Sequence, residues 1–466
     1  MDPKAKLRTV RFPKIGAPRE PRPELPPRVF AARVQKLRAR MKERRLDAMM
    51  VYGDREHFAN LHYLTNYDPR FEEALLIVYP SGTPILFVGN EGMGYSQVAR
   101  LPVVRRLYQT FSLLGQPREK VRDFSLLLRD AGIGKCRRVG EAGWKYFSAT
   151  EFKDAAHVLD LPEFIAASIR KALPRGASLT NETAIFMDAQ DGLRSVLEPE
   201  QIADFEWVAT VNSQSLLDGI RALRPGMTEM DAYAKMSDCG MPHSCHPVCA
   251  SGENVRRCVM PSPTSRKLRL GDPVLFTSAY QGANTCRFGW IAGSEKDLPR
   301  AIRDYVPRVA APYFNATATW YEAMRVGAMG NELHHAVHDR LDPLALHVGL
   351  NTGHQIATDE WTHSLVADGS RQRVRSGMYF QADFFPMTNT PHFGAFAEDG
   401  LIVADASLRR TLASRYPTMW RRIHARQEFL IGQLGIRISE DLLPLSNFPA
   451  AVMPFLLAPN RCLSMC

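Results

Sequence analysis

A long amphipathic helix is predicted in the middle of the chain, and it separates two regions with different patterns. The helix begins near Glu198, and the turn-forming segment Arg224-Pro225-Gly226 ends it. Apolar residues recur along it at helical spacing, interrupted once by the polar Asn212: Ile202, Phe205, Val208, Ala209, Leu216 and Ile220. Such a stripe has to be buried against another layer. We therefore expect a sheet of the same domain to cover it.

Before this helix, short apolar runs alternate with helical segments. Ala48–Tyr52, Ala74–Tyr79 and Pro84–Val88 have the composition of strands, and a turn at residues 80–83 joins the last two. Helices are expected at Arg118–Ala131 and Leu161–Leu173. The alternation predicts an α/β domain over residues 28–180.

After residue 190, strands and helices are segregated. The runs Val274–Thr277, Met378–Phe385 and Gly400–Ala404 are predicted strands, and Pro299–Val326 and Asn331–Leu341 are predicted helices. A dinucleotide-binding glycine pattern is absent from this sequence. We expect an α+β domain over residues 190–466.

The 466 residues leave room for two domains, and their net charge of +10 raises the question of nucleic-acid binding. Much of this charge lies in a proline-rich arm, residues 1–27, which we expect to run extended over the surface or over a partner subunit. More lies on the polar face of a predicted helix near residues 33–45, without interleaved aromatic side chains. The sequence therefore predicts no nucleic-acid partner.

No apolar stretch is long enough to cross a membrane, and no apolar region follows the basic N-terminal residues as it would in a secretory signal. We expect a cytoplasmic protein that does not bind membranes. The eight cysteines are then expected to be reduced.

Several segments occur in an order that resembles the creatinase, aminopeptidase P and prolidase family. Residues 60–67 with Asp68-Pro69-Arg70-Phe71 resemble the family's N-terminal domain, and the central helix resembles the opening of its C-terminal "pita-bread" domain. Further matching pieces are Pro225-Gly226-Met227-Thr228-Glu229, Ser251-Gly252-Glu253-Asn254, Gly271-Asp272-Pro273-Val274, Gly353-His354, Ser376-Gly377-Met378 and Glu398-Asp399-Gly400. The resemblance spans residues 30–430 and implies a mixed-sheet α/β N-terminal domain followed by an α+β pita-bread domain.

In the family's metallopeptidases, two aspartates, one histidine and two glutamates hold two divalent ions that activate a water. The resemblance places His354 on the ligand histidine and Glu398 on the last glutamate. Asp383 stands where the first glutamate belongs, and Thr277 stands where the first aspartate belongs. The second aspartate's position falls on Thr285, Cys286 or Phe288. The resemblance thus implies a degenerate metal site.

The family's catalytic histidine is also missing, because Arg256-Arg257-Cys258-Val259 stands in its place. Cys258 could act as a nucleophile if a neighbouring arginine lowers its pKa. The alternative is a buried, inert thiol.

Creatinase itself offers the informative comparison, since it shares the fold without the full metal set and hydrolyses a C–N bond of a small cationic substrate. That resemblance implies His354, Asp383 and Glu398 as catalytic residues, with the carboxylates holding a guanidinium or ammonium group. We accordingly expect a hydrolase or lyase that cleaves a C–N bond in a small amino-acid-derived or amidino substrate, without a dinuclear metal centre. A standard Xaa-Pro peptidase is not expected.

Two alternatives stay open. The same three residues could hold a single divalent ion, such as iron, in a biosynthetic enzyme. The chain could also be a non-catalytic binding protein on the same fold. The expected cofactor is therefore either none or one divalent metal ion.

Other residues are candidates for substrate binding. Asp359-Glu360-Trp361 could line a cation pocket, with the indole face adding attraction, or form a solvated turn. Thr277, Cys286 and Cys258 are also expected there. The resemblance further implies a homodimer that brings Arg70 and Phe71 into the neighbouring subunit's pocket, where an arginine would hold a substrate carboxylate. Otherwise these two residues lie in an exposed turn.

Overall fold

The computed structural model describes residues 5–237, 239–257 and 260–466, which form two compact units. The N-terminal unit is Leu25–Ser195, and the C-terminal unit joins the segment ending at Glu24 to Val196–Cys466. The N-terminal unit continues beyond residue 180, where the sequence placed its end, because Phe186 and its neighbours pack into its core. Among the described residues, no helix is long and apolar enough to cross a membrane.

A six-stranded mixed sheet forms the centre of the N-terminal unit. Its strands lie in the order β5 (Val104–Leu107), β4 (Ile85–Val88), β3 (Ala74–Val78), β2 (Ala48–Gly53), β6 (Arg138–Ala142) and β7 (Ser178–Asn181). The pairs β2–β3 and β3–β4 are antiparallel, and the other neighbours are parallel. The three strands predicted from the sequence are confirmed as β2, β3 and β4.

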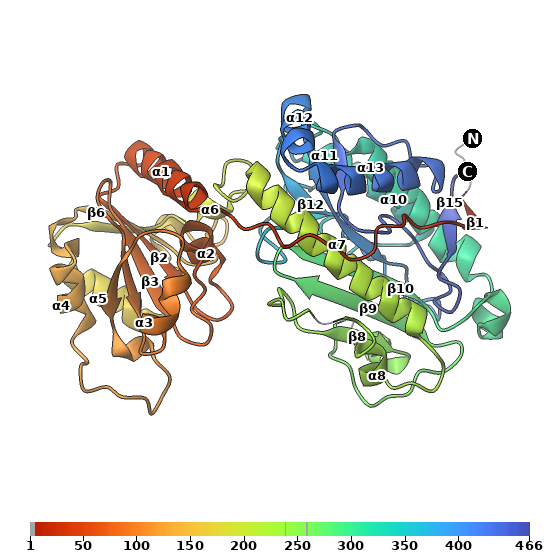
Figure 1. Ribbon diagram of the computed structural model, residues 1–466, viewed down its shortest axis with the longest axis horizontal. Helices are drawn as coiled ribbons and strands as arrows, with labels where there is room; N and C mark the ends of the chain where they lie inside the picture. Colours follow the sequence, from red (N-terminus) through yellow and green to blue (C-terminus); the bar gives the residue numbers. More distant parts are fainter. Residues whose placement is uncertain (1–4, 238, 258–259) are drawn as a thin grey trace. The chain divides into compact units, whose positions relative to one another are not determined.

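Both faces of this sheet are covered, because successive side chains on a strand point to opposite sides. Met49 and Val51 of β2 enter one core with α1 (Pro27–Glu43) and α2 (Ala59–Thr65). Met50 of β2 enters the other core, which α4 (Phe124–Asp130) and α5 (Glu163–Ala172) cover (Figure 1). The helix predicted from Arg118 begins only at Phe124, because the Asp123 side chain caps it by accepting the Ser125 N–H.

The C-terminal unit contains a seven-stranded sheet whose pairings are all antiparallel. The order is β11 (His354–Gln355), β12 (Tyr379–Gln381), β13 (Ala397–Val403), β10 (Ala283–Trp290), β9 (Pro273–Tyr280) and β8 (Val248–Ser251), with β14 (Leu442–Pro444) also paired to β13. The strand predicted over Met378–Phe385 is confirmed only as Tyr379–Gln381, because the chain beyond it leaves β13 and bridges at Pro386 to Val348 instead.

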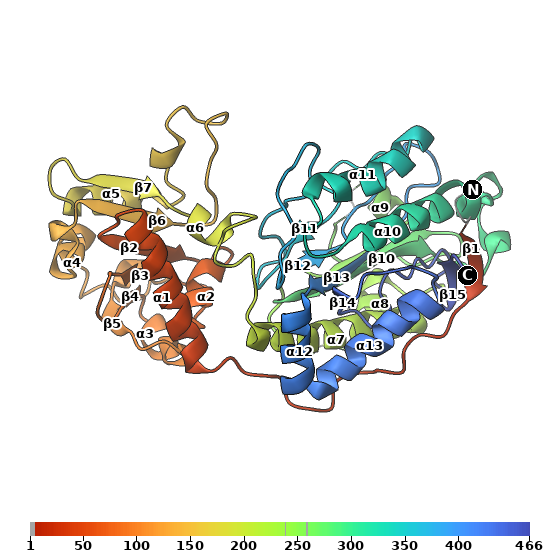
Figure 2. The ribbon, with the colours of Figure 1, turned by 90° about the horizontal axis from the view of Figure 1, so that it is seen from above.

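Helices cover both faces of the second sheet, as Figure 2 shows. The predicted central helix is confirmed as α7 (Pro199–Ala222), and it packs with α12 (Ala406–Arg415) and α13 (Pro417–Gly432) on one face. On the other face lie α10 (Ala311–Ala323) and α11 (Gly330–Leu341). The apolar stripe of α7 is thus buried as expected.

The helix predicted over Pro299–Val326 is wrong as a single element. The structure has a 3₁₀ turn at Arg300–Ile302, a π-helical turn at Val306–Ala310, and then α10. Pro307 and Pro312 lie in the first turns of the last two segments. The interruption lies at residues 303–304, and the π-helical segment then continues directly into α10, because Ala310 at their junction keeps helical backbone angles. Proline lacks the backbone N–H that a helix interior uses, and each of these two prolines lies within the first turn of its segment.

The N-terminal arm is extended and belongs to the C-terminal unit of its own chain (Figure 1). Its strand β1 (Lys6–Thr9) pairs antiparallel with β15 (Arg461–Ser464). Farther along, Arg22 forms an ion pair with Asp204 of α7 at 2.6 Å, and Glu20 forms one with Arg422 of α13. These contacts fix the arm along the helices that cover the sheet.

Candidate functional site

Three neighbouring strands bring one row of side chains to the same face of the second sheet. Thr277 on β9 lies directly opposite Cys286 on β10, and Cys286 lies directly opposite Glu398 on β13. The Thr277 hydroxyl donates to the Cys286 sulfur at 2.8 Å. A two-residue turn, Gln281-Gly282, sets this register, and Gly282 has φ +98°, which a side chain would strain.

This register decides among the three positions that the sequence left open. Cys286 lines a cavity together with Thr277 and Glu398. Thr285 points to the opposite face, where its hydroxyl accepts a hydrogen bond from Asn212 of α7 at 3.3 Å. Phe288 packs among other aromatic rings, outside the lining of the cavity. Cys286 is therefore the residue that faces Thr277 across the site.

The cavity has a volume of about 440 Å³, within the range of small-molecule sites. Its polar lining consists of Cys245, Thr277, Asn284, Cys286, His347, Glu360, Asp383 and Glu398. Its apolar lining consists of Val248, Met260, Leu275, Val348, Leu350, Trp361, Phe384, Phe385, Met387 and Phe396, with Gly349. Among the described residues, no lysine or arginine lines it.

His354 lies fully buried beside this cavity, on β11. Its Nε2 atom is 3.2 Å from Oε1 of Glu360 and 3.5 Å from Oδ2 of Asp383. Its ring stacks on Trp361, with centroids 4.0 Å apart and planes 12° from parallel. Burial alone would lower the pKa of His354, but the negative charges of Glu360 and Asp383 raise it well above the usual value. The two carboxylates therefore favour the cationic form of the imidazole.

The backbone before His354 is fixed by α10. The indole N–H of Trp320 donates to the Thr352 carbonyl at 2.7 Å. Gly353 has φ +111°, and a Cβ there would lie 2.8 Å from the Trp320 ring. Only glycine allows the chain to pass this closely before it enters β11.

Glu398 is the most deeply buried of the three acids, with 3% of its surface exposed. Asn284 donates to its Oε1 atom at 2.9 Å. Burial, followed by the charges of Asp383 and Glu360, raises the pKa of Glu398 well above the usual value. For Glu360, burial would also raise the pKa, but His354 lowers it below the usual value. A cation beside Glu398 would favour its ionised form.

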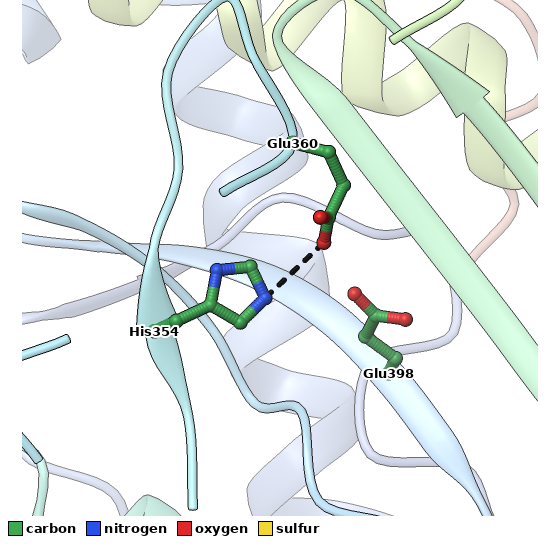
Figure 3. Close-up of side chains that lie close together, drawn as sticks. All are labelled: His354, Glu360 and Glu398. Carbon is green, nitrogen blue, oxygen red and sulfur yellow. Dashed lines mark ion pairs between the residues drawn. The ribbon is translucent and has the colours of Figure 1, made fainter. Parts of the chain in front are cut away.

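Glu360 converges on the same point as His354 and Glu398, as Figure 3 shows. One potential ligand atom from each of these residues lies within 4.8 Å of the others. In the described part of the chain, this is the one such cluster of three or more His, Cys, Asp or Glu side chains. Asp383, which the sequence grouped with His354 and Glu398, contacts His354 but lies outside this group. One imidazole and two carboxylates suit a single divalent ion.

The two thiols of the cavity are poor nucleophiles. Burial raises the pKa of Cys245 to about 11, and it also raises the pKa of Cys286 well above the usual value. Both are therefore neutral near pH 7. Cys258, the candidate nucleophile from the sequence, lies outside the described residues.

Of the remaining predicted site residues, some line the cavity and others do not. Glu360 and Trp361 line the cavity, whereas their neighbour Asp359 does not. Arg70 belongs to the N-terminal unit, where its Nε atom donates to the Tyr95 hydroxyl at 2.8 Å. Phe71 in the same unit is 52% exposed. Their role in a neighbouring subunit's pocket stays a prediction.

Sequence reasoning missed Asn284 and most of the apolar wall. Asn284 was detectable, because it lies two residues before Cys286 on a strand and so shares its face. Many wall residues come from loops near residues 345–350 and 383–387, where no periodic pattern relates them, whereas Val248 and Leu275 lie on β8 and β9.

Comparisons with known proteins match both units. Residues 208–405 match the family model described as Metallopeptidase family M24, and residues 33–169 match the Creatinase/Prolidase N-terminal domain. A search of curated proteins found no match.

Solved structures resemble the chain in fold. The prolidase from Pyrococcus horikoshii OT3 is 15% identical, with a TM-score of 0.59 over 80% of this chain and 95% of that one. The Xaa-Pro dipeptidase from Bacillus anthracis is 14% identical, with a TM-score of 0.60 over 81% and 96%. The X-Pro aminopeptidase from Thermotoga maritima MSB8 is 13% identical, with a TM-score of 0.60 over 80% and 95%.

Proposed function

The chain belongs to the creatinase and prolidase family with its pita-bread domain, and from this premise we propose that it is a hydrolase, or a related lyase, that cleaves a C–N bond in a small cationic substrate. The proposal includes the absence of the dinuclear metal centre used by the family's metallopeptidases. The substrate class is an amidino or amino-acid-derived compound.

The observation that carries this proposal is the charge of the cavity. Glu360, Asp383 and Glu398 line it, and no lysine or arginine of the described chain lines it with them. His354 offsets only part of this negative charge. Acidic groups in a partly enclosed site attract a cation more strongly than they would in water. A guanidinium or amidinium group matches paired carboxylates in both charge and shape.

The residues around the cavity suit distinct roles in such a reaction. Glu398 and Asp383 would bind the cationic group and accept a proton from the attacking water. His354 would donate a proton to the departing nitrogen, with Glu360 holding its ring. Hydrolysis then balances: the hydroxyl of water bonds to carbon as the C–N bond breaks, and the departing nitrogen takes the proton from His354. The proton that the carboxylates took from water returns to His354.

Two metal ions fit this set of residues poorly. A pair of dications needs several anionic ligands to offset their repulsion. The strands β9 and β10 contain no acid, and the cavity receives from them a hydroxyl, an amide and a neutral thiol: Thr277, Asn284 and Cys286. For this reason we do not assign to this chain the Xaa-Pro activity for which the similar structures are named.

A mononuclear metal enzyme is the second candidate, and the convergence of His354, Glu360 and Glu398 favours it. A single bound ion would supply Lewis-acid or redox chemistry. The ligand set differs from the sequence-based expectation, because Glu360 takes the place of Asp383.

Turnover of guanidino, amidino and amide-bearing compounds by metal-depleted protein tests the proposal. We expect measurable C–N cleavage by the wild type and a loss of about 100-fold or more in Glu398→Gln, which keeps the shape of the side chain and removes its charge. Glu440→Gln is the matched control, because Glu440 is 84% exposed. Activity that requires one added ion would favour the second candidate. Tight binding without turnover would indicate a non-catalytic binding protein.

A further inference from the structure

The cavity changes character from one end to the other. Its polar end is buried: Glu398 is 3% exposed and Asn284 is 7% exposed. Its exposed lining is mainly apolar, because Leu350, Met387 and Met260 are 70%, 52% and 51% exposed, with the exposed His347 in the same loop as Leu350. Large exposed apolar side chains that line the same cavity indicate a binding surface.

A firm apolar wall connects the two ends. Phe384 is almost fully buried and packs against Tyr313 of α10, with ring centroids 5.4 Å apart. Phe385 packs against Phe396 at 5.3 Å. These contacts hold the rings in place, so the wall is formed before any ligand binds.

The open rim is formed by two loops that are tied together. An antiparallel bridge joins Val348 to Pro386, and it places the segment carrying Leu350 beside the segment carrying Met387. Both residues line the same cavity as the acids. The apolar path from the buried acids to the solvent is therefore continuous.

We propose that the substrate is an amphipathic cation, with a guanidinium-like or ammonium head at the acids and an apolar tail along Phe384 and Phe385 to the rim at Leu350. This inference rests on the proposed function for the head of the molecule. The apolar tail is inferred independently, from the residues that line the cavity. A compound as small and polar as a bare amidino acid would leave most of the cavity volume of roughly 440 Å³, and its aromatic wall, without a partner.

A series of n-alkylguanidinium ions with methyl, butyl, hexyl and octyl chains, titrated calorimetrically into the full chain, tests this inference. Burial of each methylene should tighten binding about threefold to fourfold until the tail leaves the rim. The matching n-alkylureas have a similar shape without the charge. They should bind at least about tenfold more weakly at every length.

Leu350→Ser provides the test of the rim. We expect it to weaken octylguanidinium binding about fivefold and to leave methylguanidinium binding unchanged. Leu344→Ser is the matched control, since Leu344 is 54% exposed nearby in the sequence and does not line the cavity.

The outcomes separate the two halves of the inference. Guanidinium binding that does not depend on chain length overturns the apolar tail and leaves the proposed function standing. Equal binding of ureas and guanidinium ions overturns the cationic head, and with it the proposed function. A change of molecular mass in solution for Leu350→Ser, with unchanged affinity for the octyl compound, assigns the rim to a subunit interface and overturns the inference.

Discussion

Thr277 and Cys286 lie opposite each other on β9 and β10, and Cys286 also lies opposite Glu398 on β13. The side chains at these two positions determine how much charge this part of the cavity lining has. Neither offers an anion near pH 7, since one is a hydroxyl and burial raises the pKa of the Cys286 thiol well above its usual value. The cavity therefore has acids on β13 and in the neighbouring loops but none on β9 or β10. This site therefore differs from one suited to two metal ions in a single row of side chains, the one that contains Thr277 and Cys286.

Restoring acids to this row should create the second metal position. We expect the double variant Thr277→Asp with Cys286→Asp to bind two divalent ions per chain, because the added carboxylates offset the repulsion between the ions. Without metal, the crowded acids should lower its melting temperature below that of the wild type. Thermal denaturation with and without Mn²⁺, together with the metal content, measures both effects.

The matched control is Thr277→Asn with Cys286→Asn, which has nearly the same shape without the charge. It should bind no more metal than the wild type. Equal metal uptake by the two double variants would contradict the role assigned to charge at this row.

Glu141 is a buried acid of the N-terminal unit, far along the chain from the candidate site. One carboxylate oxygen accepts the Asp160 N–H at 3.1 Å, and the other has no hydrogen-bond partner among the described residues. Burial raises its pKa from 4.5 to about 8. The folded protein therefore holds this proton over a pH range in which the unfolded chain has released it.

Stability should consequently fall as the pH rises from about 4.5 to about 8, because the folded state binds more protons across that window. Glu141→Gln resembles the protonated side chain and should remove this loss. We expect equal stability of variant and wild type near pH 4, and an advantage for the variant on the order of 3–5 kcal/mol above pH 8. Urea denaturation across this range measures the difference, and a constant difference at all pH values would refute it.

At the scale of elements, a buried charge network fastens α7 to α13. The Glu206 carboxylate accepts a hydrogen bond from Arg422 Nε at 2.9 Å and one from Arg426 at 2.6 Å. Glu206 and Arg426 are both fully buried. Burial opposes the charge on Glu206, but the two arginines lower its pKa below the usual value. The network joins the two helices that cover one face of the sheet.

Removing one partner of a buried pair leaves the other charge poorly compensated. Arg426→Leu should therefore destabilise the protein by about 3 kcal/mol in urea denaturation. Arg421→Leu, an exposed change on the same helix, should alter stability by less than about 0.5 kcal/mol. Similar effects of the two substitutions would show that the network contributes little.

The elements differ in how far the sequence predicts them. Strands such as the one at Ala48–Tyr52 can be predicted because every residue is apolar and a turn follows. The interruption at residues 303–304 and the π-helical geometry of Val306–Ala310 fall within a continuous apolar pattern, and periodicity alone does not resolve them.

The candidate site was predictable where its residues belong to motifs that resemble those of the creatinase and prolidase family. His354, Asp383 and Glu398 follow from motif order, and the structure places all three at or beside one cavity. The choice of Cys286 over Thr285 depends on the register of a hairpin, and one residue of slip reverses the face. Glu360 lies in a loop, so its contact with His354 depends on the tertiary path of the chain.

At the scale of the whole molecule, the segment Leu25–Ser195 has its own sheet and a core on each face of it. We expect this segment to fold alone, because it is continuous in sequence and its apolar side chains are covered by its own helices. A cooperative urea transition of the isolated segment would show this. A transition without cooperativity would contradict independent folding. In the isolated segment, Glu141→Gln should change the pH dependence of stability as it does in the full chain.

We propose that the cavity binds an organic cation and that the enzyme cleaves the C–N bond of this cation without a pair of metal ions. The most direct measurement is turnover of the best guanidino or amidino compound before and after chelation, with divalent metal counted in the same samples. We expect unchanged turnover in protein that contains no stoichiometric ion. Two ions per chain in the active protein, with activity lost on chelation and restored by Mn²⁺, would contradict it.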